Sequence, residues 1–269
     1  MGLLVGIYAP NTPTLVGDLG VRHRPTELAL RELGQRWGPK LRAWVVISPH
    51  FVTGGGFGVV GQDRLRQIYD FTGFPEEFYQ VAYPAPGDPG LARAIVAQAA
   101  SRGVPAELVD EQWGLDHGAW SPLVHLSPEA AIPVVPVSIA PNLGEEAHMR
   151  FGEAIRAAAG DTPIGLVATG SLIHRLDLWS RPGSSLPERA QVFLAAAHRA
   201  LENGVWQELW EVDGQAMRAA APEGGRFPLA VMRGALPCFS GKVLAEELEF
   251  GAVSLSTVEL IPCPQPTPV

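Results

Sequence analysis

The chain is poor in cysteine and lacks any long apolar run. Its two cysteines, Cys238 and Cys263, lie apart in the sequence and lack the CxxC spacing of zinc ribbons and redox motifs. Isolated cysteines fit a reduced, cytoplasmic protein, which is the location we expect. No segment approaches the run of about 18 apolar residues that crosses a bilayer, so no membrane partner is expected. The first residues, MGLLVGIYAP, also lack the basic and apolar parts of a secretory signal.

Clustered basic residues are missing as well. The formal net charge is -8 at pH 7, and no run of Lys and Arg stands out. A surface that follows a phosphate backbone needs such clusters, so we expect no nucleic-acid partner. Hydrophobic residues make up 46% of the chain and charged residues 18%, a balance that predicts a folded globular protein.

Proline and glycine are plentiful, but they are spread along the whole chain. Because they do not gather into a linker, they indicate many loops on one scaffold rather than two tethered domains. We expect residues 1–262 to form one domain, followed by a short C-terminal tail of residues 263–269.

Short apolar runs alternate with amphipathic segments along the chain. The apolar runs predict strands at residues 3–8, 43–48, 132–139, 164–169 and 253–261. Helical spacing predicts helices at residues 24–37, 91–101, 118–126, 145–159, 187–203, 206–217 and 228–236. Strands separated by helices predict an α/β fold, a single domain with a central, mostly buried mixed sheet flanked by helices.

Three histidines share one context. His50 follows the apolar run AWVVISP, His174 follows GLVAT by a short segment, and His117 lies in the loop GLDHG. Ligands of open α/β sheets collect beyond the carboxyl ends of strands, so these imidazoles are expected to face one crevice. The alternative for each histidine alone is a loop residue satisfied by local hydrogen bonds.

The other histidines suggest structural or surface roles. His148 and His198 fall inside amphipathic helices, where a solvated face is the simpler interpretation. His125 is expected to be helical and structural, and His23 is ambiguous.

A carboxylate near these histidines would complete a metal site. Two histidines and one carboxylate on one face are the arrangement of non-haem Fe(II) oxygenases. Glu223 is the candidate, because it stands in APEGGRFP before an apolar helix and beside glycines that allow close backbone approach. The alternative for Glu223 is a charge that stabilises the N-terminus of that helix.

Several stretches of the sequence are similar to one known family. They are ISPHF (47–51), IYDFTGFPEEFYQVAYPAPGDPGLA (68–92), GLDHGAWSPL (114–123), IPVVPVSI (132–139), TGSLIHRL (169–176) and GAVSLSTVEL (251–260). Together they resemble the class III extradiol ring-cleavage dioxygenases, which include the protocatechuate 4,5-dioxygenase beta subunit and the 4,5-DOPA dioxygenase type. The resemblance covers essentially the whole chain.

The resemblance implies an enzyme that inserts both atoms of O2 beside the two ring oxygens of a catechol-like or aminophenol-like aromatic. It implies a non-haem Fe(II) site, although another divalent metal such as zinc is compatible. By the same resemblance His50 is a metal ligand, and Glu223 lies where one branch has its carboxylate ligand. His174 matches an acid/base histidine, and His117 matches a histidine that lines the substrate and oxygen site.

One position departs from the family pattern. The family has a histidine ligand after its first strand, whereas this chain has APNTP at residues 9–13, so Asn11 is the third candidate ligand. A neutral amide oxygen binds Fe(II) more weakly than imidazole does. The chain is therefore either an active dioxygenase with an altered metal shell or a non-catalytic, metal-poor subunit that pairs with an active partner. A homo-oligomer or a pair with a related subunit is expected, and a hydrolase on the same scaffold is a third alternative.

The segment of residues 68–90 is rich in aromatic residues and predicts a long ordered loop. These side chains either form a small core of the loop itself or provide a wall of the substrate pocket or a subunit interface.

Overall fold

The sheet at the centre of the protein contains parallel and antiparallel strands. The computed structural model describes residues 2–179 and 185–264. In this part of the chain eight strands form one sheet in the order β4-β3-β5-β2-β6-β1-β8-β7. They are β1 (Leu3–Ala9), β2 (Ala43–Val52), β3 (Phe57–Val59), β4 (Ala106–Leu108), β5 (Val134–Ile139), β6 (Ile164–Thr169), β7 (Phe239–Glu249) and β8 (Val253–Pro262). The predicted α/β fold with a mixed sheet is confirmed.

The four central strands are parallel. β5, β2, β6 and β1 pair in parallel, while β8 runs antiparallel to β1. Along β2, Trp44 and Val46 belong to one hydrophobic cluster, and Val45 and Ile47 belong to the other. This alternation covers both faces of the strand, as its continuous apolar run predicts. The carboxyl ends of all four strands consequently meet at one edge.

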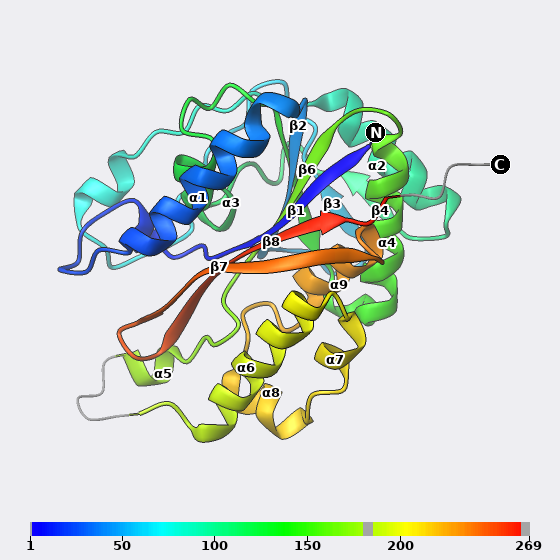
Figure 1. The fold of residues 1–269 in the computed structure, drawn as a ribbon. Coiled ribbons are helices and arrows are strands. Elements are labelled where there is room, and N and C mark those ends of the chain that lie inside the picture. Colours follow the sequence, from blue (N-terminus) through cyan, green and yellow to red (C-terminus); the bar gives the residue numbers. More distant parts are fainter. Residues whose placement is uncertain (1, 180–184, 265–269) are drawn as a thin grey trace.

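Helices cover both faces of the sheet (Figure 1). On one face lie α1 (Arg24–Trp37) and α3 (His117–Leu126), and on the other lie α2 (Pro89–Ser101), α4 (Gly144–Ala159) and α9 (Phe227–Ala235). A further group near β7 contains α6 (Glu188–Asn203), α7 (Trp206–Trp210) and α8 (Gly214–Ala220), while α5 (Leu176–Trp179) lies near the β7–β8 turn.

Local signals set several helix boundaries. Asp88 caps α2, because its Oδ1 accepts a hydrogen bond from the backbone N–H of Leu91 at 2.9 Å. The predicted helix at residues 206–217 is wrong in extent, since α7 ends at Trp210 and Asp213 caps the separate helix α8. β7 is absent from the sequence prediction, because the apolar run at residues 243–245 and the adjacent Glu246 and Glu247 break the strict alternation that indicates a half-buried strand.

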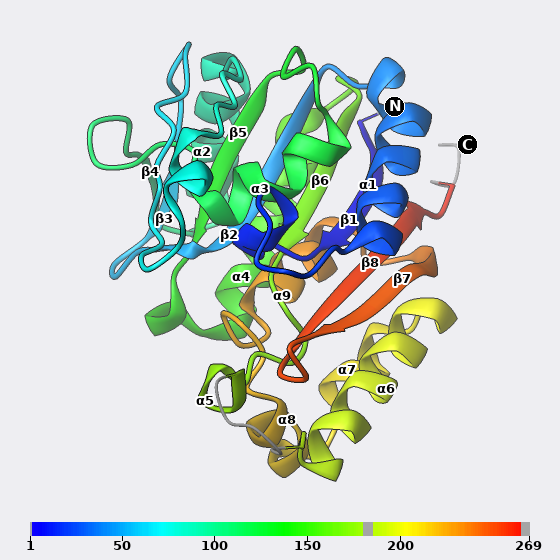
Figure 2. The ribbon, with the colours of Figure 1, turned by 90° about the vertical axis from the view of Figure 1, so that its left-hand side faces the viewer.

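The β7–β8 hairpin extends past the sheet toward α5 (Figure 2). Val253 and Leu255 at its tip pack against Trp179, and the Phe250 ring lies 4.6 Å from the Trp179 ring. This contact brings the last residue of β7, Glu249, to the edge where the central parallel strands end.

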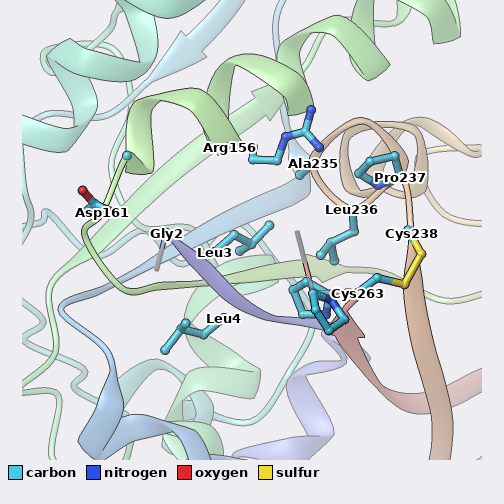
Figure 3. Close-up of a pocket in the computed structure, with 13 residues that line it drawn as sticks. Gly2, Leu3, Leu4, Arg156, Asp161, Ala235, Leu236, Pro237, Cys238 and Cys263 are labelled. Carbon is cyan, nitrogen blue, oxygen red and sulfur yellow. A yellow bond between two sulfur atoms is a disulfide. The ribbon is translucent and has the colours of Figure 1, made fainter. Parts of the chain in front are cut away.

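A disulfide joins Cys238 to Cys263 (Figure 3). The two residues are 25 positions apart, and the hairpin between them returns the chain so that the backbone N–H of Cys263 bonds to the Cys238 carbonyl at 3.1 Å. The expectation of two reduced cysteines is therefore wrong, because sequence spacing does not reveal a contact made through a hairpin. The cytoplasmic location stays a prediction, and the cysteines no longer support it.

Two other expectations concern the chain ends and the membrane. Of the predicted tail, residues 265–269 lie outside the described residues, so the boundary at residue 262 stays a prediction. Among the described residues, no helix has the length and apolar character that crossing a membrane requires.

Reduction of the disulfide is expected to destabilise the protein. Closing a loop between residues separated by 25 positions restricts the unfolded chain, which corresponds to about 3.5 kcal/mol in the loop-entropy model. Urea unfolding with and without a reducing agent measures this difference, and the Cys238→Ser/Cys263→Ser variant should show no effect of the reducing agent. Two free thiols per native, unreduced chain in a thiol titration would contradict the prediction.

Of the two histidines predicted to lie on solvated helix faces, one is buried. His148 is fully buried: its Nε2 accepts from the backbone N–H of Ala140 at 3.0 Å, and its Nδ1 lies 2.6 Å from the Gly144 carbonyl. The predicted solvated face is wrong there, because the side chain satisfies its polar atoms with backbone groups. Burial lowers the pKa of His148. His198 is partly exposed and contacts Ser256 at 3.1 Å.

His125 is structural, as the sequence predicts. It is buried, and its Nε2 lies 2.6 Å from the Leu15 carbonyl. This contact fixes α3 against the segment that follows β1.

Candidate active site

The carboxyl ends of the central strands border a cavity of about 310 Å³. All five residues predicted for the site line this cavity: Asn11, His50, His117, His174 and Glu223. They come from different parts of the chain, and the parallel strands bring them to one edge. The three histidines expected to face one crevice do so, together with Glu223 and Asn11, although the chemical roles of all five residues stay predictions.

His50 lies between two carboxylates. β2 continues to Val52, so His50 is inside the strand rather than after it. Its Nε2 is 2.8 Å from Glu223 Oε1, and its Nδ1 is 3.1 Å from Asp70 Oδ2. Burial alone would lower the pKa of His50, but the hydrogen bonds and charges of Asp70 and Glu223 raise it to about 10.

Glu223 is held by its backbone and aims its side chain at the cavity. Its N–H donates to the Ser171 carbonyl at 2.9 Å. Gly224 follows with a φ of 65°, and a Cβ there would lie 2.9 Å from Pro49 Cβ, so the close approach to β2 requires glycine. α9 begins only at Phe227 and has no acidic residue in its first turn, so the helix-terminus interpretation of Glu223 is wrong.

One oxygen of Glu223 has partners and the other has none. Glu223 Oε1 accepts from Asn11 Nδ2 at 3.2 Å and contacts His50. Glu223 Oε2 is buried and finds no hydrogen-bond partner among the described residues. Burial would raise the pKa of Glu223, but the hydrogen bond with His50 and the charges of His174 and His50 keep it below its usual range. Such an unpaired carboxylate oxygen indicates a place for a cation or a donor.

Asp70 is a cavity residue that the sequence analysis missed, as it also missed Glu249. Its Oδ1 accepts from the backbone N–H of His117 at 2.9 Å and lies 2.8 Å from His117 Nδ1. Burial would raise the pKa of Asp70, yet its hydrogen bonds with His117 and His50 hold it far below the usual range. The carboxylate lies in the stretch IYDFTG, inside the longest segment of family resemblance, and that position was the available signal.

His117 opens α3 at the wall of the cavity. Asp116 caps the helix, accepting from the backbone N–H of Ala119 at 3.1 Å and from Ser48 Oγ at 2.6 Å. These bonds tie the start of α3 to β2, so His117 and His50 lie together with ring centroids 4.1 Å apart.

His174 enters the cavity from the segment after β6. Its backbone N–H donates to the Ala220 carbonyl at 3.0 Å, and it forms an isolated bridge with Val253 in the hairpin. Its backbone is therefore held from two sides.

Two overlapping groups of donors could hold a divalent ion. In the first, His50 Nε2, Glu223 and Asn11 converge; the oxygen and nitrogen of an Asn amide exchange by a flip, so Asn11 can present its oxygen. In the second, ligand atoms of His50, Asp70 and His117 lie within 4.8 Å of one another. The first fits better, because Glu223 keeps an unpaired oxygen whereas Asp70 already accepts N–H bonds.

Aromatic side chains of the 68–90 loop form one wall of the cavity. Phe71 and Phe74 line it, and the Phe71 ring also lies 4.9 Å from the Tyr79 ring and 5.3 Å from the Phe74 ring. The loop therefore has a core of its own and also provides the pocket wall, so both sequence interpretations hold. A role in a subunit interface stays a prediction.

A second cavity lies at the other end of the sheet (Figure 3). It has a volume of about 820 Å³ and is bordered by Leu3, Arg156, Leu236 and the disulfide cysteines. It contains none of the predicted site residues.

The fold and the smaller cavity have the layout of a metal-dependent α/β enzyme. Residues 25–258 match the family described as the catalytic LigB subunit of aromatic ring-opening dioxygenase. The chain belongs to this family, whose enzymes depend on a metal ion. The resemblance to class III extradiol dioxygenases and the prediction of a dioxygenase enzyme are confirmed.

Similar proteins include enzymes of one named activity. The chain is 40% identical over 149 residues to the 4,5-DOPA dioxygenase extradiol of Escherichia coli, an alignment that spans 55% of this chain and 54% of that protein. It is 36% identical over 200 residues to the protein of the same name from Beta vulgaris, covering 73% and 74% of the two chains. The crystal structure of an uncharacterized protein from Escherichia coli K12 superposes with a TM-score of 0.74 at 26% identity, covering 95% of this chain and 99% of that one.

Proposed function

We propose that the protein cleaves a catechol-like or aminophenol-like ring with O2 at a non-haem Fe(II) site held by His50, Glu223 and Asn11. One observation carries the proposal: His50 Nε2 and Asn11 both meet Glu223, whose second oxygen is buried without a partner among the described residues. Fe(II) there would supply redox chemistry toward O2 and Lewis-acid binding for the two ring oxygens.

Asp70 orients the ligand histidine. A hydrogen bond from His50 Nδ1 to Asp70 fixes the ring and directs Nε2 at Glu223. This carboxylate–histidine arrangement also raises the basicity of the ligating nitrogen.

The other two histidines act on the substrate. His174 takes the proton of a ring hydroxyl in the step that opens the ring and returns a proton to the product. His117 donates through Nδ1 to Asp70, which leaves Nε2 to contact the substrate. The cavity of about 310 Å³ and its Phe71 and Phe74 wall suit a single aromatic ring and limit the entry of water.

The test is oxygen consumption by Fe(II)-reconstituted protein. Anaerobically loaded enzyme is mixed with catechol or an aminophenol, and O2 uptake is followed together with the absorbance of the ring-opened product. We expect one O2 consumed per ring opened. Retention of the metal without O2 uptake on any such substrate would contradict the proposal. That result would favour the alternative of a non-catalytic subunit. In that case, purification from the native host should also recover a related chain bound to this one.

Asn11→His is expected to tighten metal binding by about 10-fold or more, because imidazole is the better ligand for Fe(II) and zinc. Competition with a chromogenic chelator measures the affinity. Asn142→His, at an exposed asparagine that does not line the cavity, serves as the control. Equal affinities of Asn11→His and the wild type would remove Asn11 from the ligand set.

The predicted cytoplasmic location and the predicted homo-oligomer, or pairing with a related subunit, remain proposals. Light scattering of the purified chain, alone and after co-expression with neighbouring genes, tests the second.

A further inference from the structure

The described residues that line the cavity include several carboxylates and no permanently charged cation. Three carboxylates line it: Asp70, Glu223 and Glu249. Among the described residues that line it, none is Lys or Arg. A ring substituent that carries a carboxylate would therefore meet no Lys or Arg among the described lining residues, and burying an anion without such a partner is costly.

Two of the three carboxylates already contact residues of the proposed metal site. Asp70 is bonded to His50 and His117, and Glu223 Oε1 contacts His50 and Asn11. Their charges thus belong to the site that would hold the ion and the ring oxygens.

Glu249 belongs to a different part of the wall. It ends β7 and is 1% exposed. Its Oε1 accepts from Thr12 Oγ1 at 3.2 Å, from Thr14 Oγ1, and lies 3.1 Å from His23 Nε2. Its Oε2 is buried and has no hydrogen-bond partner among the described residues. A carboxylate fixed on one oxygen and unpaired on the other is prepared to accept a bond from a cationic or N–H group.

His23, whose role the sequence leaves open, contacts Glu249 from outside the cavity. It is buried, lies 3.6 Å from Glu247 Oε1, and is not among the residues that line the cavity. It therefore holds Glu249 in place and does not offer its charge directly to a ligand.

The wall near Glu249 is otherwise apolar. Phe74, Leu176, Trp179 and Val253 line the cavity along with it. A short alkyl chain on the ring can pack against these side chains and carry a terminal group to Glu249.

We infer that the cavity selects aromatic diols whose side chain ends in an ammonium group, with Glu249 as the residue that recognises it, and disfavours those whose side chain ends in a carboxylate. This inference rests on the proposed function, because it assumes that the ring oxygens bind at the His50 and Glu223 side.

Equilibrium binding of three matched catechols tests the inference without turnover. The probes are dopamine, dihydrocaffeate and ethylcatechol, which carry an ammonium, a carboxylate and no charge on similar chains. Anaerobic calorimetry on the Fe(II)-reconstituted protein gives each Kd. We expect dihydrocaffeate to bind at least about 10-fold more weakly than dopamine, because like charges in an interface are strongly disfavoured.

A matched pair of variants assigns the preference to Glu249. Glu249→Gln keeps an oxygen for Thr12, Thr14 and His23 but removes the charge, so the ratio of the two Kd values should fall at least about fivefold. Glu202→Gln, at an exposed carboxylate of α6, should leave the ratio unchanged. If Glu249→Gln does not fold, the ratio of the two wild-type Kd values alone tests the preference for an ammonium over a carboxylate.

The possible failures are distinguishable. Dihydrocaffeate binding as tightly as dopamine, with ethylcatechol also bound, overturns the inference and leaves the proposed function standing. An unchanged ratio in folded Glu249→Gln overturns the role of Glu249. Failure of all three catechols to bind overturns the proposed function together with the inference.

Discussion

His50→Ala is expected to abolish stoichiometric metal binding and to lower kcat/KM by at least about 10³-fold, because a catalytic metal supplies several kcal/mol of transition-state stabilisation. The His50 ring joins the two halves of the site: Nε2 contacts Glu223 and Nδ1 contacts Asp70. Without it two partly buried carboxylates face each other with no imidazole between them. Metal analysis after anaerobic reconstitution and steady-state oxygen uptake measure the two effects.

The control for this variant is His198→Gln, at a partly exposed histidine of α6 outside the cavity. It should keep both metal and activity within about twofold, as surface substitutions usually do. Circular dichroism verifies that His50→Ala is folded. A folded His50→Ala protein that retained one ion per chain would show that the ligand set lies elsewhere.

His174→Ala is expected to lower kcat by about 10² to 10⁴-fold, the usual range for a positioned acid or base, while metal content stays the same. His174 lines the cavity, and its backbone is held by Ala220 and Val253, so truncation of the side chain should leave the local fold intact. The effect should fall on kcat more than on KM, because proton transfer is needed in the transition state rather than for binding.

Added imidazole provides a second readout for His174→Ala. A small base that diffuses into the cavity vacated by the side chain should restore part of kcat, whereas a purely structural defect would not respond. Loss of the metal together with activity would contradict the acid/base role and identify His174 as a ligand.

The edge at which the site forms could be predicted from the sequence. Continuous apolar runs identify the central strands. His50 and His174 come after two of these apolar runs, so a shared crevice follows from the parallel arrangement of the strands. Glu223 could be proposed from its glycine neighbours, since Gly224 allows the close approach to β2 that the structure has.

Residues brought in by long loops and hairpins could not be predicted. Asp70 reaches His50 from an irregular segment without periodicity, and Glu249 reaches the cavity only because the β7–β8 hairpin folds back toward α5. The pairing of Cys238 with Cys263 depends on the same hairpin. Local spacing carries no information on such contacts, because they are fixed by tertiary packing.

The location of the bound metal tests the central claim most directly. Crystals of the Fe(II)-reconstituted protein, measured anaerobically at the iron absorption edge, give an anomalous peak at the ion. We predict one peak per chain next to His50 Nε2, Glu223 and Asn11. A peak on the other side of His50, between Nδ1, Asp70 and His117, or no peak in protein loaded with excess Fe(II), would contradict it.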